Sequence, residues 1–317
     1  MVTFLTRRLL LMIPVALLVS FVTFMIIHLI PGDPARVLLG ESATRETVAA
    51  LDRQLGLDKP LLVQYFIWLG QAFHGNLGQS IQLAQPVTPA ILQRLPVTLE
   101  LGAISLIVSV ALAIPLGVLA AARRNTPVDW LINTVSLVGT AIPNFVLGLL
   151  LILVLAVLVR PFPPGGYVPF TEDPLGNLRD LVLPVITLAA GAVAGNMRQI
   201  RASMIEVLNQ DYIRTARAKG LNRGRVYFVH ALRNALLPFL TIVGLQAGAI
   251  LGGAVIIETI FLWPGVGLLA VQSILSKDYP VVQGIVLLSA LSYMFVNLLV
   301  DISYGVLDPR INLSAGH

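Results

Sequence analysis

The sequence predicts an all-α integral membrane protein with six transmembrane helices. Hydrophobic residues make up 56% of the 317 residues and charged residues only 12%, whereas a soluble domain carries about 25% charged residues. The mean hydropathy is +0.86, and apolar segments of the roughly 20 residues needed to cross a bilayer recur along the chain. Of the 21 Lys and Arg residues, 13 gather in alternate short loops and at the termini, while the intervening short loops hold three.

The first predicted span covers Leu9–Ile30, which follows the basic pair Arg7 and Arg8 and ends at Pro31. A secretory signal peptide is the alternative, but its apolar region would cover about 7–15 residues and lead to a small-residue cleavage site. This segment is longer and leads directly into prolines. We therefore expect a retained helix whose basic amino terminus lies in the cytoplasm.

Residues 31–96 form a polar segment that we expect outside the membrane. Two short helices are predicted in it, Ala43–Leu55 and Leu61–Phe73. The second helix carries Tyr65 and Trp68, and aromatic residues are typical of helices that lie at the membrane interface. We expect the segment to cap the spans.

The other five spans follow from the remaining apolar segments. They are Val97–Ala122, Trp130–Val159, a span that starts near Leu181 and continues beyond the membrane, Leu236–Leu262, and Val281–Val306. Pro143 interrupts the third span and predicts a kink. Trp263, just after the fifth span, is expected at the interface. Six spans place both termini on the same side, which the loop charges identify as the cytoplasm.

The loop between the fourth and fifth spans, residues 206–238, is called the basic loop below. Six Lys and Arg residues and no acid lie between Arg214 and Arg233. A Lys or Arg at the bilayer centre costs about 2.5–3.5 kcal/mol, so the loop must be aqueous. Its pattern predicts a helix over 212–219, a turn rich in Gly and Asn, and a second helix over 225–237 that Pro238 ends.

The residues of the basic loop resemble a known family. The loop contains Thr215-Ala216-Arg217-Ala218-Lys219-Gly220, then His230-Ala231-Leu232-Arg233-Asn234-Ala235, then Pro238. These residues resemble the EAA loop of ABC importer permeases, particularly the dipeptide and oligopeptide permease subunits, although Thr215 stands where the name-giving Glu would be. The stretches LGLDKP at 55–60 and GNLGQS at 75–80 are similar to the B-type peptide permease subunits.

This resemblance implies a type I ABC importer permease fold, with residues 1–96 as first helix and outer segment and 97–317 as the permease domain. It implies a cytoplasmic coupling helix that docks in a groove of a separate ATPase. The implied coupling residues are Thr215, Ala216, Arg217, Ala218, Lys219, Gly220 and Leu221. The implied partners are a homologous second permease, two ATP-binding cassette ATPase subunits and an extracytoplasmic substrate-binding protein. The implied location is the inner membrane of a bacterium.

Sequence motifs exclude several kinds of chemistry for this chain. It lacks GxxxxGK[ST], the loop that cradles ATP phosphates, so ATP and Mg²⁺ would bind the partner ATPases and this chain would be a transport subunit without cofactor. HExxH and GxSxG are also missing, and there is no cysteine. The net charge of +5 follows the loop pattern and does not indicate nucleic-acid binding.

Two groups of residues inside the spans are further candidates. Gly244, Gly248 and Gly252 are spaced four apart, which lets helices approach closely. The contact would be within the chain or against a second permease. Three acids lie in or near spans, namely Glu100, Glu258 and Asp301. Such acids are candidates for a transport role, with Glu258 a candidate for the pathway and Asp301 for pairing with an arginine.

Two alternatives to a peptide importer remain. Importers of glutathione or nickel have closely similar permeases, so the substrate does not follow from these motifs. An ion-coupled secondary transporter would be a different class, and it would predict inverted repeats and polar groups near the membrane midplane. Neither feature is evident in the sequence.

Overall fold

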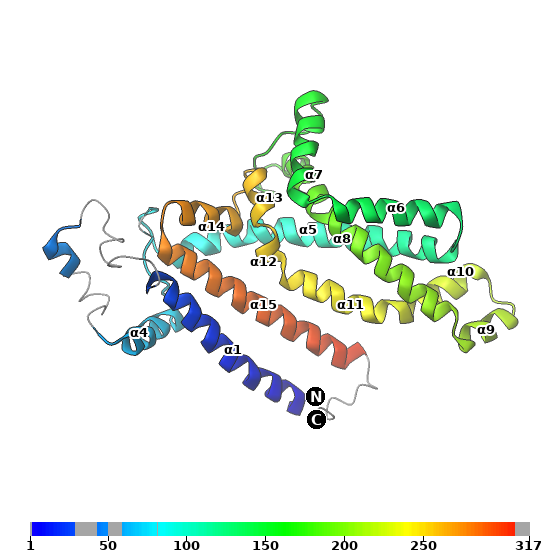
Figure 1. Ribbon diagram of the computed structural model, residues 1–317, viewed down its shortest axis with the longest axis horizontal. Coiled ribbons are helices and arrows are strands. Elements are labelled where there is room, and N and C mark those ends of the chain that lie inside the picture. The colour runs from blue at the N-terminus through cyan, green and yellow to red at the C-terminus, as the bar shows by residue number, and fades with distance from the viewer. Residues whose placement is uncertain (1, 29–42, 50–58, 81, 308–317) are drawn as a thin grey trace. The chain divides into compact units, whose positions relative to one another are not determined.

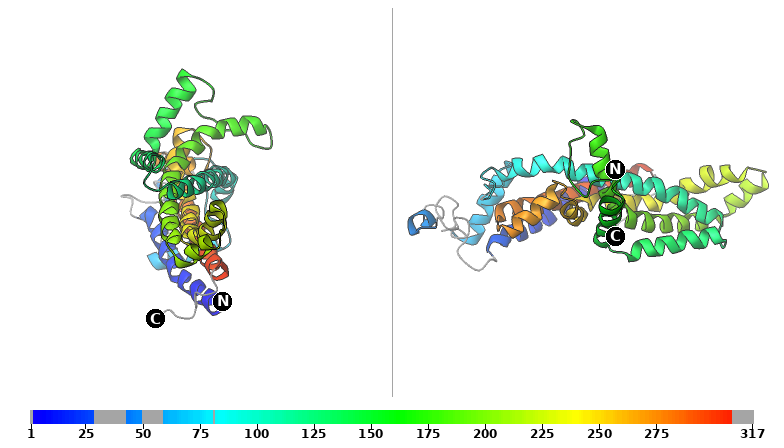
Figure 2. Two further views of the ribbon diagram at one scale, coloured as in Figure 1. Left: turned by 90° about the vertical axis from the view of Figure 1, so that its right-hand side faces the viewer. Right: turned by 90° about the horizontal axis from the view of Figure 1, so that it is seen from above.

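The computed structural model describes residues 2–28, 43–49, 59–80 and 82–307, and these residues are predominantly helical. The chain forms two compact units. Unit 1 combines residues 1–97 with 264–317, and unit 2 covers residues 98–263. Helix α5 (Val87–Ala122) begins in unit 1 and ends in unit 2. Figure 1 shows the helices in chain order and Figure 2 shows two further views.

In unit 1, α1 (Val2–His28) and α15 (Tyr279–Leu307) lie side by side in opposite directions (Figure 1). Near one end of the pair, the Gln283 side-chain amide donates to the backbone carbonyls of Thr23 at 3.0 Å and Phe24 at 3.2 Å. Near the other end, Arg8 forms an ion pair with Asp301. The start of α1 and the end of α15 therefore lie on the same side, and Asp301 has the arginine partner that the sequence analysis expected.

Helix α4 (Leu61–Phe73) has the predicted bounds and packs against α1. The Tyr65 hydroxyl lies 2.7 Å from the Ser20 hydroxyl, and Gln64 Oε1 lies 2.9 Å from His28 Nε2. Several apolar side chains of α4 are exposed, including those of Leu62, Val63, Phe66 and Phe73. An exposed apolar face fits the predicted position at the membrane interface. Of the other predicted outer helix, residues 43–49 lie within the described residues, and 45–49 are helical.

The end of α5 that belongs to unit 1 packs with two helices from the other end of the chain. Val87 and Ile91 of α5 form a buried core with residues of α14 (Val266–Leu275) and α15. On the same side of the unit, the Ser80 hydroxyl donates at 2.5 Å to the buried carboxylate of Asp278. These contacts join the outer segment to the last span.

Helix α8 (Pro174–Leu208) is the central element of unit 2 and packs against α6, α7, α11 and α13. Its 35 residues correspond to about 52 Å at 1.5 Å per residue, well beyond the roughly 30 Å of bilayer hydrocarbon. The predicted continuation of this span past the membrane is therefore present as one helix. A Cβ atom added at Gly117 of α5 would lie 2.7 Å from Ile200 Cβ of α8, so α5 and α8 cross here at a distance that requires glycine.

The third predicted span is bent much more sharply than a kink. Helix α6 (Pro127–Ala141) and the helix of α7 (Asn144–Leu151) with the π-helical segment η2 (Ile152–Leu158) meet at 97°. Ile142 has an extended backbone with ψ 119°, the conformation that a residue before proline prefers. Pro143 therefore breaks the helix at the predicted position.

The fifth span differs from the prediction at both ends. Pro238 was expected to end a helix, yet the chain is helical from Arg223 to Gly248 and Pro238 lies inside α11 (Leu232–Gly248). Membrane helices tolerate an internal proline because neighbouring groups and local adjustments satisfy the freed carbonyl. Beyond Gly248, the span predicted as one helix is interrupted at Ala249 and Ala254, giving α12 (Ile250–Gly253) and α13 (Val255–Ile260).

Among the described residues, five helices are long and apolar enough to cross a membrane, and the bent α6–α7 pair is a sixth candidate. Each corresponds to one predicted span. The members of the glycine series of the fifth span differ in burial. Gly248 is buried, whereas Gly252 is exposed and a Cβ atom added there would meet nothing within 4 Å. The proposed contact of this series with a second permease stays a prediction.

Candidate coupling site

The basic loop contains a short helix, α9 (Asp211–Ala218), that lies between the end of α8 and the start of α10 (Arg223–Arg225). Figure 1 shows α9 and α10 together at one end of unit 2. Two α9 side chains three residues apart, Ile213 and Ala216, are buried. They join one apolar core with residues of α5, α8, α11 and the π-helical segment η3 (Val226–Ala231). Helix α9 is thus anchored to the ends of two long helices.

The opposite face of α9 is exposed and basic. It presents Arg214, Thr215, Arg217, Ala218 and Lys219. The predicted coupling residues therefore divide into two groups, because Ala216 packs in the core of this chain whereas the residues of the basic face are exposed. The pattern of Ile213 and Ala216 at positions i and i+3 was a sequence signal for this division.

A glycine-dependent cap ends α9. Gly220 N–H donates to the Arg217 carbonyl at 2.9 Å, and Leu221 N–H donates to the Ala216 carbonyl at 3.3 Å. This pair of bonds around a residue in the left-handed region, here Gly220 with φ +76°, is a Schellman motif. The Asn222 side chain then accepts from Gly224 N–H at 2.8 Å and caps α10. The turn direction between the two helices is therefore fixed by two backbone bonds and one side-chain cap.

Side chains also hold α9 against the helix that follows it. The Asn234 side-chain amide donates to the Tyr212 hydroxyl at 2.7 Å. Tyr212 is the second residue of α9, and Asn234 lies in the first turn of α11. The two ends of α9 are therefore fixed independently, one by this bond and the other by the Gly220 cap.

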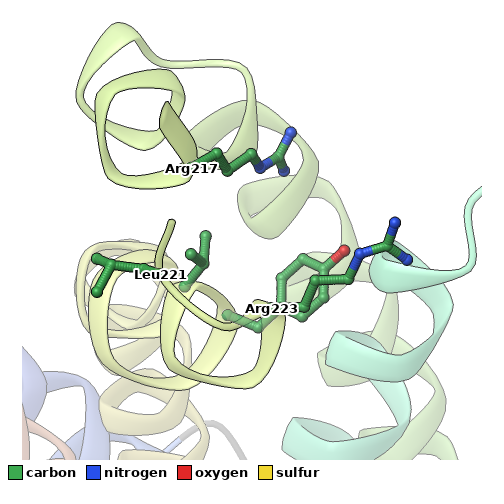
Figure 3. A pocket seen from close by; sticks show the side chains of 5 residues that line it. Arg217, Leu221 and Arg223 are labelled. Atoms are coloured by element: carbon green, nitrogen blue, oxygen red, sulfur yellow. The ribbon is translucent and has the colours of Figure 1, made fainter. Parts of the chain in front are cut away.

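A cleft of about 440 Å³ opens between the end of α9 and the start of the next helix. It is lined by Arg217, Leu221, Arg223, Val226 and Tyr227. Figure 3 shows the Arg217 and Arg223 side chains extending toward the same side of this cleft. Neither arginine takes part in the ion pairs found among the described residues.

A second feature, which the sequence analysis missed, ties α8 to α6. Arg201 Nε lies 2.6 Å from Asp129 Oδ1 and a terminal guanidinium nitrogen lies 2.7 Å from Oδ2. The Asp129 carboxylate also accepts from Asn125 N–H at 2.9 Å and from the Asn133 side-chain amide at 2.7 Å. The aspartate side chain is 5% exposed and the arginine 24%. Asp129 after Pro127 is a sequence signal for a helix start, but nothing local indicates its partner 72 residues away.

A polar cluster joins three helices at Asn196, which lies closer than Arg201 to the start of α8. Asn196 and Gln246 exchange two hydrogen bonds of 2.9 and 3.0 Å between their amide groups. Asn196 also donates to Ser109 of α5 at 2.9 Å. A cavity of about 180 Å³ lies beside Gln246 and is lined partly by Ser105. Polar groups within spans are costly and often mark transport pathways. Sequence reasoning considered charged residues only and missed these amides.

The acids predicted in unit 2 are held by hydroxyl groups. Glu258 is fully buried and its Oε1 accepts from the Thr98 hydroxyl at 2.6 Å. The Tyr167 hydroxyl donates to Glu100 at 3.3 Å. Burial and the nearby Glu100 carboxylate raise the pKa of the Tyr167 hydroxyl above its ordinary value. The Tyr167 ring packs edge-on against Trp263 at 4.7 Å. Trp263 is fully buried among protein side chains, and its position at the membrane interface stays a prediction.

Within the described ranges, no three His, Asp or Glu side chains come together to hold a metal ion. The two arginines of the cleft and the basic face of α9 are suited to binding an anionic surface. The Asp129–Arg201 pair and the Asn196–Gln246 pair are suited to holding helices in register.

Comparison with known proteins identifies the family. Residues 113–313 match the family described as the binding-protein-dependent transport system inner membrane component, and residues 1–102 match its N-terminal family. The chain belongs to this family. It is a multi-pass inner membrane protein and a transport permease subunit.

Two relatives cover nearly the whole chain. The dipeptide transport system permease protein DppB of Escherichia coli (strain K12) is 43% identical over an alignment that covers 98% of this chain and 99% of that protein. The oligopeptide transport system permease protein AppB of Bacillus subtilis (strain 168) is 42% identical with the same coverage of each chain. These similarities confirm the resemblance to peptide permease subunits that the basic loop indicated.

Proposed function

We propose that this chain is the membrane-spanning permease subunit of an ATP-driven importer of dipeptides or oligopeptides. It would form the translocation pathway with a homologous second permease. Two ATPase subunits would bind on the cytoplasmic side, and a substrate-binding protein would deliver peptide on the other side. The observation that carries the proposal is helix α9, which is anchored by Ile213 and Ala216 on the long helices and presents a basic face to a partner.

The anchoring of α9 suggests how force would pass from the ATPases to the spans. Because Ile213 and Ala216 pack in the same core as residues of α8 and α11, a displacement of α9 moves the ends of both helices. ATP and Mg²⁺ would bind the partner ATPases, whose closure would draw the coupling helices together and open the permeases outward. Hydrolysis would reverse the movement. This chain would transmit the motion without catalysing a reaction.

The orientation follows from charge and from the α1–α15 pair. The basic loop belongs in the cytoplasm by the positive-inside rule. The start of α1 and the end of α15 lie on the same side of unit 1, as the Arg8–Asp301 pair indicates. Both termini would then be cytoplasmic. A peptide substrate is supported by the names of the two relatives, which specify dipeptide and oligopeptide transport.

We expect a pull-down of this chain in mild detergent to recover a second permease and ATPase subunits. The recovered complex should hydrolyse ATP, whereas the purified chain alone should not, because it has no phosphate-binding loop. Transport into vesicles should then be compared for dipeptides, oligopeptides, glutathione and nickel. Recovery of the intact chain with no ATPase, together with ion-driven uptake, would contradict the proposed function.

Single cysteines should report the orientation, because the chain has no native cysteine. We expect Gln71→Cys and Glu172→Cys to react in intact cells with a thiol reagent that does not cross membranes. Arg225→Cys should react only after the cells are permeabilised. All three side chains are exposed, so access depends on the side of the membrane. Reaction of the Arg225→Cys variant in intact cells would reverse the assignment.

A further inference from the structure

We propose that the cleft between α9 and α10–η3 receives an acidic side chain, a glutamate by its shape, from the ATPase partner. The carboxylate would lie between Arg217 and Arg223, and its methylene groups would contact the apolar floor of the cleft. The proposal rests on the proposed function, to which it adds the charge and the kind of residue that the partner must present.

The basic loop contains two acids, Glu206 and Asp211, and neither lines the cleft. Asp211 is the sole acid among residues 211–225, and its carboxylate lies 3.3 Å from Arg214, outside the cleft lining. Arg217 and Arg223 face the same side of the cleft (Figure 3). Two guanidinium groups that line one cleft repel each other, and a carboxylate between them would accept charge-assisted hydrogen bonds from both.

The floor of the cleft suits a side chain with an apolar stem. Val226 is only 2% exposed, and Leu221 and Tyr227 are half-buried. Apolar walls below two cations match a side chain that carries methylene groups behind its charge. The walls also lower the local dielectric, which strengthens the interaction with a carboxylate. The volume of about 440 Å³ leaves room for the neighbouring backbone of a partner loop.

Lipid headgroups are the other source of anions near a membrane, but the cleft lies too far from the hydrocarbon. From Leu181 to Met197, helix α8 has 17 uncharged residues, about 25 Å of helix. The remaining residues to Leu208 add about 16 Å, so the helix extends about 11 Å beyond the roughly 30 Å of hydrocarbon. The headgroup layer on one side is only about 5–8 Å thick. The helical stretch that leads back to the membrane gives a similar distance. Arg223 lies ten residues before Arg233, which is about 15 Å of helix.

The test is the affinity of the purified ATPase for this permease complex in nanodiscs of phosphatidylcholine alone. The double variant Arg217→Glu/Arg223→Glu should bind the ATPase on the order of 10–100-fold more weakly. Arg217→Lys/Arg223→Lys should keep most of the affinity. The matched control is Arg225→Glu/Arg233→Glu, which changes the net charge equally at two exposed positions outside the cleft, and its effect should be several-fold smaller. A Glu→Arg substitution of the ATPase glutamate that enters the cleft should restore binding to the Arg217→Glu/Arg223→Glu complex. It should not restore binding to the Arg225→Glu/Arg233→Glu complex.

The outcomes separate this inference from the proposed function. If the wild-type complex binds ATPase and the cleft variant binds it equally well, the inference is wrong and the proposed function stands. If the wild-type complex binds no ATPase, the proposed function itself fails. If the cleft variant differs from wild type only in nanodiscs that contain phosphatidylglycerol, the cleft binds lipid and the inference is overturned.

Discussion

The variant Asp129→Asn is expected to lower the free energy of unfolding by about 3 kcal/mol. Removing one member of a buried ion pair typically costs about 3–5 kcal/mol, because the other charge is left without compensation. The lower end of this range applies here, because the Arg201 side chain is 24% exposed and water can partly solvate its charge. The carboxylate also accepts from Asn125 and Asn133, so the substitution disturbs the start of α6 together with its contact to α8.

The loss of helical circular dichroism during unfolding in detergent measures this effect. Trp130, which follows Asp129, is already 71% exposed, so its fluorescence would change little when α6 leaves α8. The matched control is Asp211→Asn, which removes one member of the exposed Asp211–Arg214 pair. Exposed pairs contribute about 0–1 kcal/mol, so this variant should unfold almost as the wild type does. Equal stability of the two variants would show that the Asp129–Arg201 pair does not hold α6 against α8.

The same pair should matter for coupling. Helix α6 follows a movement of α8 through the contacts between the two helices. Among the ion pairs of the described residues, Asp129–Arg201 is the one that joins α6 to α8. We therefore expect Asp129→Asn complexes to hydrolyse ATP with weaker stimulation by substrate and binding protein. A variant with both charges exchanged, Asp129→Arg/Arg201→Asp, should recover part of the stability, because the attraction is restored while the bonds from Asn125 and Asn133 are not.

The spans were predictable because their signal is local. A segment such as residues 181–197 shows its apolar length directly, and Pro143 shows its break. The tolerance of Pro238 and the interruptions at Ala249 and Ala254 depend on neighbouring helices, which a single segment does not reveal. The Asp129–Arg201 and Asn196–Gln246 pairs join distant parts of the chain. Residue types at such separations have no spacing rule, so their meeting could not be derived from sequence.

The basic loop was largely predictable for a different reason. Its helix, its turn and the special role of Gly220 follow from glycine being the residue that adopts positive φ at low cost. The division of the loop into a buried and an exposed face was less accessible. Ala216 belongs to the resembled motif, yet it packs against this chain's own core. A shared motif therefore mixes residues that hold the helix in place with residues that are free to meet a partner.

Gly220→Val is expected to reduce transport by about tenfold or more while leaving membrane insertion intact. Gly220 has φ +76°, and a left-handed conformation costs an L-residue about 1–2 kcal/mol, with a further penalty for a branched side chain. A Cβ atom there would meet nothing within 4 Å, so the cost arises from the backbone and not from a clash. The chain can avoid it only by giving up the bonds to the Arg217 and Ala216 carbonyls, which frees the end of α9 to change direction.

Two control variants isolate this effect. Gly220→Asn should retain most of the transport, since Asn adopts the left-handed region more readily than other residues. Gly224→Val places the same side chain four residues away, where φ is not left-handed and the nearest atom would be 3.6 Å distant, so it should be nearly neutral. ATPase binding and transport are measured in reconstituted complexes at matched expression. Because the spans are unchanged, a selective loss in Gly220→Val would tie transport to the direction of α9. Normal transport by a well-expressed Gly220→Val protein would mean that the Gly220 cap does not set how α9 meets its partner.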